Sequence, residues 1–190
     1  MLNKIFRKCK RILLGAPFPS MVSGFKRADG VKVDKVRISN STFIDYKENL
    51  VIHDNVFIGH YNFIEASNGI TIEEGCQITN FITITSHSSH NSIRLYGKHY
   101  AGTEMKGYIK GKVHIGKYTF IGPHVTIMPN TNIGKGCIVA SHSFVKGEFP
   151  DFSIIAGNPA TVVGSTKDRD EQYFDENPEL KSHYDEWANS

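Results

Sequence analysis

Nine histidines give this chain the side chain best suited to proton transfer near neutral pH. Two of them, His87 and His90, open a polar and aromatic stretch at residues 85–108. Two others, His124 and His142, follow one another in the last third of the chain. The sequence shows neither a Ser-His-Asp arrangement nor an activated cysteine. The histidines therefore favour general-base assistance of a direct transfer over a covalent intermediate.

These histidines lie in a sequence that repeats every six residues. Aliphatic side chains recur at that spacing, several of them followed by Gly or Ala, and a small or medium side chain comes four places after each. Two slips of two residues interrupt an earlier run of the same repeat, and the polar stretch at 85–108 separates it from the later run. The aliphatic positions are Ile38, Ile44, Leu50, then Ile52, Ile58, Ile64, Ile70, then Ile72, Ile78, Ile84, and finally Ile109, Ile115, Ile121, Ile127, Ile133, Val139 and Val145. The small positions of the later run are Thr119, Val125, Thr131, Cys137 and Ser143.

A period of six fits neither a helix nor an ordinary strand, but it fits a coil with three flat faces of one hexapeptide each. About seventeen hexapeptides would make five to six stacked coils. His87, His124 and His142 occupy the outward-facing fourth position of their hexapeptides. Because three hexapeptides separate His124 from His142 and make one full coil, these two residues are predicted to stack roughly 5 Å apart on one corner.

The repeat resembles that of the hexapeptide-repeat acyltransferases. The segment 155–163, Ile-Ala-Gly-Asn-Pro-Ala-Thr-Val-Val, resembles the end of the coil in sugar and polysaccharide acetyltransferases. The resemblance covers roughly residues 36–164 and implies an all-β, left-handed parallel β-helix with a protruding loop and short terminal helices. The left hand comes from the resemblance, since general crossover rules favour the right hand. The family also implies a homotrimer with acetyl-CoA as co-substrate, and an O-acetyltransferase for a sugar or surface-polysaccharide unit.

The resemblance also implies roles for individual residues. In related galactoside acetyltransferases the general base stands at the root of a loop between two repeat runs, which here is the place of His87. The loop residues expected to contact the acceptor are His90, Asn91, Arg94 and Tyr96.

The acetyl-CoA groove of the family runs along the later coils between two subunits. The matching positions here, expected to bind the cofactor, are His124, Ser141, Lys146, Gly157 and Asn158. Relatives often carry Lys or Arg after Asn-Pro-Ala, but this chain has Thr161, so phosphate contacts would fall to Lys146, Lys167 or Arg169. The family chemistry needs no metal, and no acidic cluster suggests one.

Two other interpretations stay open from the sequence. One is N-acetylation of an amino sugar on a nucleotide carrier. The other is a non-enzymatic β-helix or a carbonic anhydrase-like protein, which would bind zinc through histidines at the coil edges.

Length and charge set the remaining limits. A chain of 190 residues suits one domain, and a net charge of +3 is too small to argue for nucleic acid. Cys76 and Cys137 occupy small inward positions and are expected to fill the core. Nothing approaches the ~18 apolar residues of a spanning helix, so we expect a cytoplasmic protein.

Three regions are predicted along the chain. Residues 1–30 form a basic amphipathic helix and a linker, residues 31–164 form the catalytic β-helix, and residues 165–190 form a helical tail divided by Pro178. The first helix would either cap the open coil or make peripheral contact with the inner face of an anionic membrane. Its basic face consists of Lys4, Arg7, Lys8, Lys10 and Arg11.

Overall fold

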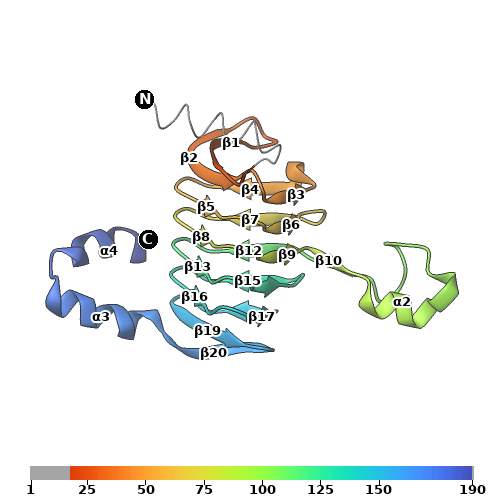
Figure 1. Ribbon diagram of the computed structural model, residues 1–190. Coiled ribbons are helices and arrows are strands. Elements are labelled where there is room, and N and C mark those ends of the chain that lie inside the picture. Colours follow the sequence, from red (N-terminus) through yellow and green to blue (C-terminus); the bar gives the residue numbers. More distant parts are fainter. Residues whose placement is uncertain (1–17, 190) are drawn as a thin grey trace.

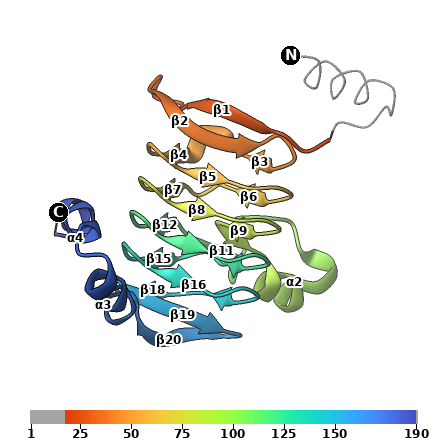
Figure 2. The same ribbon diagram turned by 60° about the vertical axis from the view of Figure 1, so that its left-hand side comes forward.

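The computed structural model describes residues 18–189 as a three-sided coil of short parallel strands with two appendages (Figure 1). The predicted N-terminal helix lies outside the described residues. Three sheets run along the coil, one on each side (Figure 2). Face A contains β1 (Met21–Lys26), β2 (Lys32–Ser39), β5 (Phe57–Ile58), β8 (Gln77–Ile78), β13 (Phe120–Ile121), β16 (Ile138–Val139), β19 (Ser153–Gly157) and β20 (Ala160–Ser165).

The other two faces have five strands each. Face B contains β3 (Phe43–Asp45), β6 (Phe63–Glu65), β9 (Thr83–Thr85), β14 (Thr126–Ile127) and β17 (Phe144–Val145). Face C contains β4 (Leu50–Ile52), β7 (Ile70–Ile72), β12 (Val113–Ile115), β15 (Thr131–Ile133) and β18 (Glu148–Phe149). Within these two sheets each strand pairs in parallel with the strand one coil away.

The register explains the two slips in the repeat. In the later coils Ile121 pairs with Val139, so one of these coils consists of three hexapeptides and nothing more. In the early coils Ile58 pairs with Ile78, so one of these coils has three hexapeptides and two additional residues. The additional residues lie at a corner, where they do not disturb the aliphatic positions, and the predicted coil is confirmed.

The aliphatic and small positions of the repeat form the core, as predicted. Ile109 is the exception, because it lies in a strand outside the coil and is only partly buried. Successive coils approach so closely that some corners accept only glycine. A Cβ on Gly116 would lie 2.6 Å from the carbonyl carbon of Gly134 in the next coil.

Both ends of face A are closed by an antiparallel strand. At the first coil β1 pairs with β2, and at the last coil β20 pairs with β19. The sequence had led us to expect a loop up to about Gly30, which is wrong for residues 21–26. The reason is visible in the hairpin, where Phe25 and Val33 are buried against the first coil and shield it from water.

Three corners join the faces and are named here by the faces they join. Corner A/B comprises residues 59–62, 79–82, 122–125 and 140–143. Corner B/C follows face B, and η1 (Lys47–Asn49) lies there in the first coil. Corner C/A comprises residues 53–56, 73–76, 116–119, 134–137 and 150–152.

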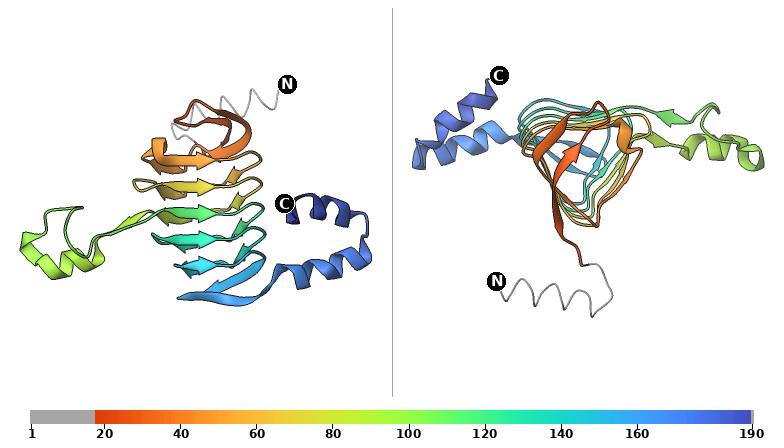
Figure 3. Two further views of the ribbon diagram at one scale, coloured as in Figure 1. Left: turned by 180° about the vertical axis from the view of Figure 1, so that it is seen from behind. Right: turned by 90° about the horizontal axis from the view of Figure 1, so that it is seen from above.

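Two appendages leave the coil on opposite sides (Figure 3). The side arm leaves corner B/C and contains β10 (His87–Ser88), α2 (His90–Tyr96), η2 (Gly97–His99) and β11 (Ile109–Lys110). The C-terminal segment contains α3 (Thr166–Glu176) and α4 (Leu180–Ala188), with Pro178 between them. It folds back to corner C/A, where Trp187 packs on Tyr118 with ring centroids 4.6 Å apart.

Candidate active site

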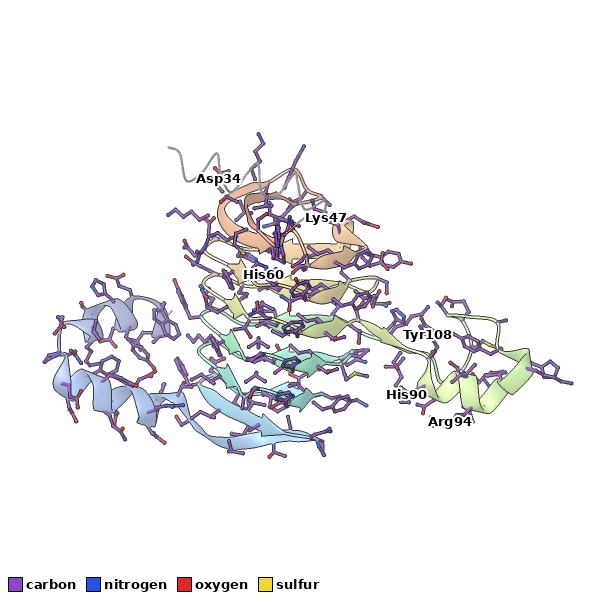
Figure 4. All side chains as sticks on the ribbon, in the orientation of Figure 1. Asp34, Lys47, His60, His90, Arg94 and Tyr108 are labelled. Carbon is purple, nitrogen blue, oxygen red and sulfur yellow. The ribbon has the colours of Figure 1, made fainter. Side chains whose placement is uncertain are left out.

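His87 lies where the coil opens into the side arm. Its strand β10 pairs antiparallel with β11, so that His87 is opposite Lys110. The imidazole stacks on the ring of Tyr108, with centroids 5.6 Å apart and planes 7° apart. Figure 4 shows Tyr108 at the root of the side arm, close to the coil. Two strands and an aromatic ring therefore hold His87 in place while its side chain remains partly exposed.

A carboxylate supports this imidazole from the neighbouring coil. Glu65 Oε2 lies 2.7 Å from His87 Nδ1, and Glu65 is only 3% exposed. The backbone amide of Ser67 donates to Glu65 Oε1 at 2.8 Å. The backbone amide and hydroxyl of Ser86 donate to Oε2 at 3.1 and 3.2 Å. Glu65 is thus a fixed, hydrogen-bonded acceptor beside the imidazole.

The charge of Glu65 is favoured by its surroundings. Burial by itself would raise the pKa of the carboxyl, but hydrogen bonds from Ser67 and Ser86 and the nearby charge of His87 more than offset this. The pKa of Glu65 is therefore lowered, and the group stays ionised at neutral pH. A buried carboxylate of this kind stabilises an imidazolium beside it.

The pairing also sets the tautomer of His87. An ionised carboxylate can only accept a hydrogen bond, so Nδ1 carries the proton that faces Glu65. The lone pair of the neutral ring is then on Nε2, which is the nitrogen able to take a proton from a bound molecule. The arrangement is that of a general base held by a carboxylate.

A second histidine–carboxylate pair lies on face C but has a different geometry. His114 Nε2 lies 3.2 Å from Glu73 Oε1. Its Nδ1 lies 2.8 Å from Asn132 Oδ1, while the amide of Asn132 donates to Glu148. Both nitrogens of His114 therefore face oxygen atoms, and neither is left to take a proton from a substrate.

Glu65 was not predicted from the sequence. The signal was present in the coil length, since Glu65 pairs with Thr85 one early coil later, and Thr85 stands two places before His87. Counting back one early coil from the root of the arm would have found this acid.

The four residues expected to contact the acceptor lie on the side arm, where His90, Asn91 and Arg94 are hydrogen-bonded within the arm itself. The Arg94 guanidinium donates to the carbonyl of His90 at 2.5 Å and to Asn91 Oδ1 at 2.8 Å. His90 Nδ1 lies 2.7 Å from the hydroxyl of Ser88 rather than beside a carboxylate. Figure 4 shows His90 and Arg94 on the side arm, below Tyr108. Tyr96 ends α2.

The residues expected to bind the cofactor fall on two corners. His124 and Ser141 lie at corner A/B, and Gly157 with Asn158 lies at the end of β19, one coil below Ser141. The rings of His124 and His142 stack with centroids 4.8 Å apart, which confirms the predicted spacing. Lys146 lies instead at corner B/C, the corner of His87. Within one chain, His87 and the residues of corner A/B are separated by the width of face B.

The part of the chain that the structure describes has neither a metal-binding cluster nor a helix that could span a membrane. Among residues 18–189 no three His, Cys, Asp or Glu side chains gather in a way that could hold a metal ion. The zinc-binding alternative therefore has no ligand cluster within one chain over that range. In the same range no helix is long and apolar enough to cross a membrane.

The coil defines the class of protein, a hexapeptide β-helix, and a histidine paired with a carboxylate lies at the root of its side arm. Residues 112–147 match the family described as bacterial transferase hexapeptide (six repeats). This part of the chain therefore carries the hexapeptide repeat of that family.

Curated relatives with similar sequences are named as acetyltransferases. A probable acetyltransferase of Mycobacterium tuberculosis is 38% identical over 110 residues, which is 58% of this chain and 33% of the relative. The putative lipopolysaccharide biosynthesis O-acetyl transferase WbbJ of Escherichia coli is 31% identical over 58% of this chain and 57% of its own. The galactoside O-acetyltransferase of Escherichia coli is 27% identical over 70% and 62%. The chain thus spans less than two thirds of the length of each of these three relatives.

Solved structures show the fold. A hexapeptide-repeat acetyltransferase from Vibrio cholerae has a TM-score of 0.57 at 19% identity, covering 67% of this chain and 69% of that one. AntD, an N-acyltransferase from Bacillus cereus solved with dTDP and 3-hydroxybutyryl-CoA, also has a TM-score of 0.57 at 22% identity, covering 79% and 89%. These neighbours imply that the coil is the left-handed β-helix of the family.

Proposed function

We propose that this protein transfers acetyl from acetyl-CoA to a hydroxyl of a sugar or surface-polysaccharide unit, with His87 as general base. One observation carries the proposal, the 2.7 Å contact between His87 Nδ1 and the buried carboxylate of Glu65. It orients Nε2 as an acceptor of protons at the root of the arm. The names of the O-acetyltransferase relatives support the same reaction class.

The chemistry follows from this geometry. Nε2 of His87 takes the proton of the acceptor hydroxyl while the oxygen attacks the thioester carbonyl. A C–O bond forms, the C–S bond breaks, and the departing thiolate recovers the proton from His87. Glu65 stabilises the imidazolium that exists between these two transfers. The carbonyl oxygen becomes negative during the attack, and a backbone amide of a nearby coil would stabilise it.

The proposal includes a homotrimer and a shared site. His124, Ser141, Gly157 and Asn158 are proposed to bind acetyl-CoA from corner A/B. His87 and Lys146 face the same molecule from corner B/C of another copy. What supports sharing is the separation of the two corners across face B in one chain. A stable monomer in light scattering at assay concentration would contradict the shared site.

Release of the CoA thiol, measured with acetyl-CoA and a panel of sugars, nucleotide-linked amino sugars and glycans, tests the function. We expect turnover with a sugar hydroxyl, which His87→Ala lowers about 10²–10⁴-fold. Acetyl-CoA binding should survive in this variant, because the imidazole serves the reacting centre. His90→Ala and His124→Ala are expected to cost less.

The same panel separates the alternatives. Turnover confined to amino sugars would establish N-acetylation instead. A near-normal turnover of His87→Ala, with loss in His90→Ala, would place the base three residues further on. Loss in neither variant would remove the side arm from the reaction.

A further inference from the structure

Four aromatic rings form a continuous stack along corner A/B. Tyr61 and Phe81 lie 5.3 Å apart with their planes at 14°. Phe81 and His124 lie 5.0 Å apart at 1°, and His124 and His142 lie 4.8 Å apart at 5°. We call Tyr61, Phe81, His124 and His142 the ring ladder. Its spacing is the spacing of the coils, so each coil contributes one ring.

The backbone conformation at these four positions does not favour aromatic residues. All four residues have a φ between 58° and 61°, the left-handed region that favours Gly or Asn. At corner C/A the same conformation is taken by Asn55, Gly75 and Gly136, and also by Tyr118 and Phe152, whose rings pack against Trp187. At corner A/B four successive coils instead carry a bulky ring in this unfavourable conformation. A property of the rings themselves therefore explains their presence.

The ladder is also more open to solvent than the rings of corner C/A, where Tyr118 is 37% exposed and Phe152 is buried. Tyr61 is 53% exposed and Phe81 is 50% exposed. By contrast, Tyr118 and Phe152 at corner C/A pack against Trp187 of α4. An uncovered row of aromatic surface of this kind marks a binding site.

The ladder and the proposed base lie at the same level of the coil. Phe81 and His87 flank the single strand β9, and in the preceding coil Tyr61 precedes β6 while Glu65 ends it. They nevertheless lie at opposite edges of face B. The stretch from Phe81 to His87 would span at most roughly 20 Å if fully extended at ~3.3 Å per residue, and the whole of β9 lies between the two residues. One chain therefore cannot bring both to the same sugar.

We propose that Tyr61 and Phe81 of one copy form the platform that binds the acceptor sugar for His87 of a neighbouring copy. This inference rests on the proposed function and names its acceptor subsite. Copies related by an axis parallel to the coil have equal levels side by side, so the platform of one copy faces the base of the next. Aromatic faces bind the apolar C–H face of a sugar ring, because the ring face is negative and C–H groups are slightly positive.

In this arrangement the upper two rings of the ladder bind the sugar, and the lower part of the ladder binds the cofactor. The sugar lies on Tyr61 and Phe81, with one hydroxyl directed to Nε2 of the partner copy's base. The proposed cofactor corner continues directly below, at His124 and Ser141. The acetyl group and the acceptor would then meet at the level of β9, where the base is.

Steady-state kinetics of Phe81→Ala tests the platform. The KM for the sugar acceptor should rise about tenfold, with the KM for acetyl-CoA unchanged. Tyr173→Ala is the matched control, because Tyr173 is an equally exposed ring on α3, outside the ladder. Tyr173→Ala should leave the KM for the sugar acceptor and the KM for acetyl-CoA unchanged. An unchanged sugar KM in Phe81→Ala would overturn the proposal, and so would its dissociation into monomers, which would make the ladder a subunit contact.

Mixed assemblies test which copy contributes the platform. His87→Ala and the double variant Tyr61→Ala/Phe81→Ala are co-expressed with different tags, and mixed trimers are purified and assayed at low sugar concentration. In each mixed trimer one site in three combines an intact base with an intact platform from the next copy. We expect the activity of the mixed trimers to rise toward that fraction of the parent activity. If no activity is recovered, the platform and the base belong to the same chain. If His87→Ala is fully active, the proposed function fails, while the effect of Phe81→Ala on sugar KM is still readable by itself.

Discussion

Glu65 Oε2 lies 2.7 Å from His87 Nδ1, although the two residues come from different coils. The contact joins a carboxylate inside the prism wall to an imidazole on the arm. A hydrogen bond to a charged partner is worth about 1.5–3 kcal/mol, which corresponds to roughly 10- to 10²-fold in rate. We therefore expect Glu65→Gln to lower kcat by roughly 10- to 10²-fold, with little change in either KM.

Circular dichroism and light scattering of Glu65→Gln provide the control for folding and assembly. Glu65→Asp, which keeps the charge but shortens the side chain, should retain more turnover than Glu65→Gln. Equal losses in the two variants would show that position rather than charge matters. Unchanged kcat in Glu65→Gln would remove Glu65 from the mechanism.

The lowered pKa of Glu65 predicts how stability depends on pH. A carboxyl whose folded pKa lies below its usual value near 4.5 binds fewer protons folded than unfolded. Its contribution to stability is therefore present above that value and is lost as the pH falls through the folded pKa. We expect the difference in urea midpoint between the parent protein and Glu65→Gln to shrink between pH 7 and pH 3. A difference that stays constant over this range would contradict the assignment.

Close approach of the coils predicts a strong effect of one added methyl group. In Gly116→Ala the new Cβ would meet the backbone of Gly134 at 2.6 Å, and backbone cannot move aside cheaply. We expect a loss of about 1–3 kcal/mol or more in the free energy of unfolding, as for other overpacked sites. Gly164→Ala is the control, because its Cβ would meet only the Ile154 side chain at 3.5 Å. Equal denaturation midpoints for the two variants would show that the coils are not in tight contact at Gly116.

The coil could be predicted from the sequence because its signal is local and periodic. An inward aliphatic every six residues is a requirement of each coil separately, and the two additional residues of an early coil lie at corner B/C, before the strand of face C. The stacking of His124 on His142 followed from the same count. Ile109 shows the limit of this reasoning, since it keeps the period but lies in the arm.

The site was harder to predict from the sequence because its contacts depend on the length of the coil. Glu65 and His87 meet only because the early coils are longer than three hexapeptides, which places Glu65 beside Thr85 at the root of the arm. The ring ladder mixes tyrosine, phenylalanine and histidine, so no single residue type reveals it. The strand at 21–26 was missed for another reason, since its antiparallel pairing has no part in the six-residue repeat.

Cys76 and Cys137 are buried and should not react with the reagent that detects the thiol released from CoA. Burial raises the pKa of Cys76 to about 12 and raises that of Cys137 as well, so neither is a thiolate at pH 8. Replacing the third cysteine in Cys9→Ser leaves only these two thiols. In the folded variant we therefore expect no reaction with a disulfide reagent on the time scale of the thiol-release assay. Addition of denaturant should expose both thiols and give two equivalents per chain. Rapid labelling of the native variant would mean that the coil opens near these residues, and the core at corner C/A would then be less stable than its complete burial indicates.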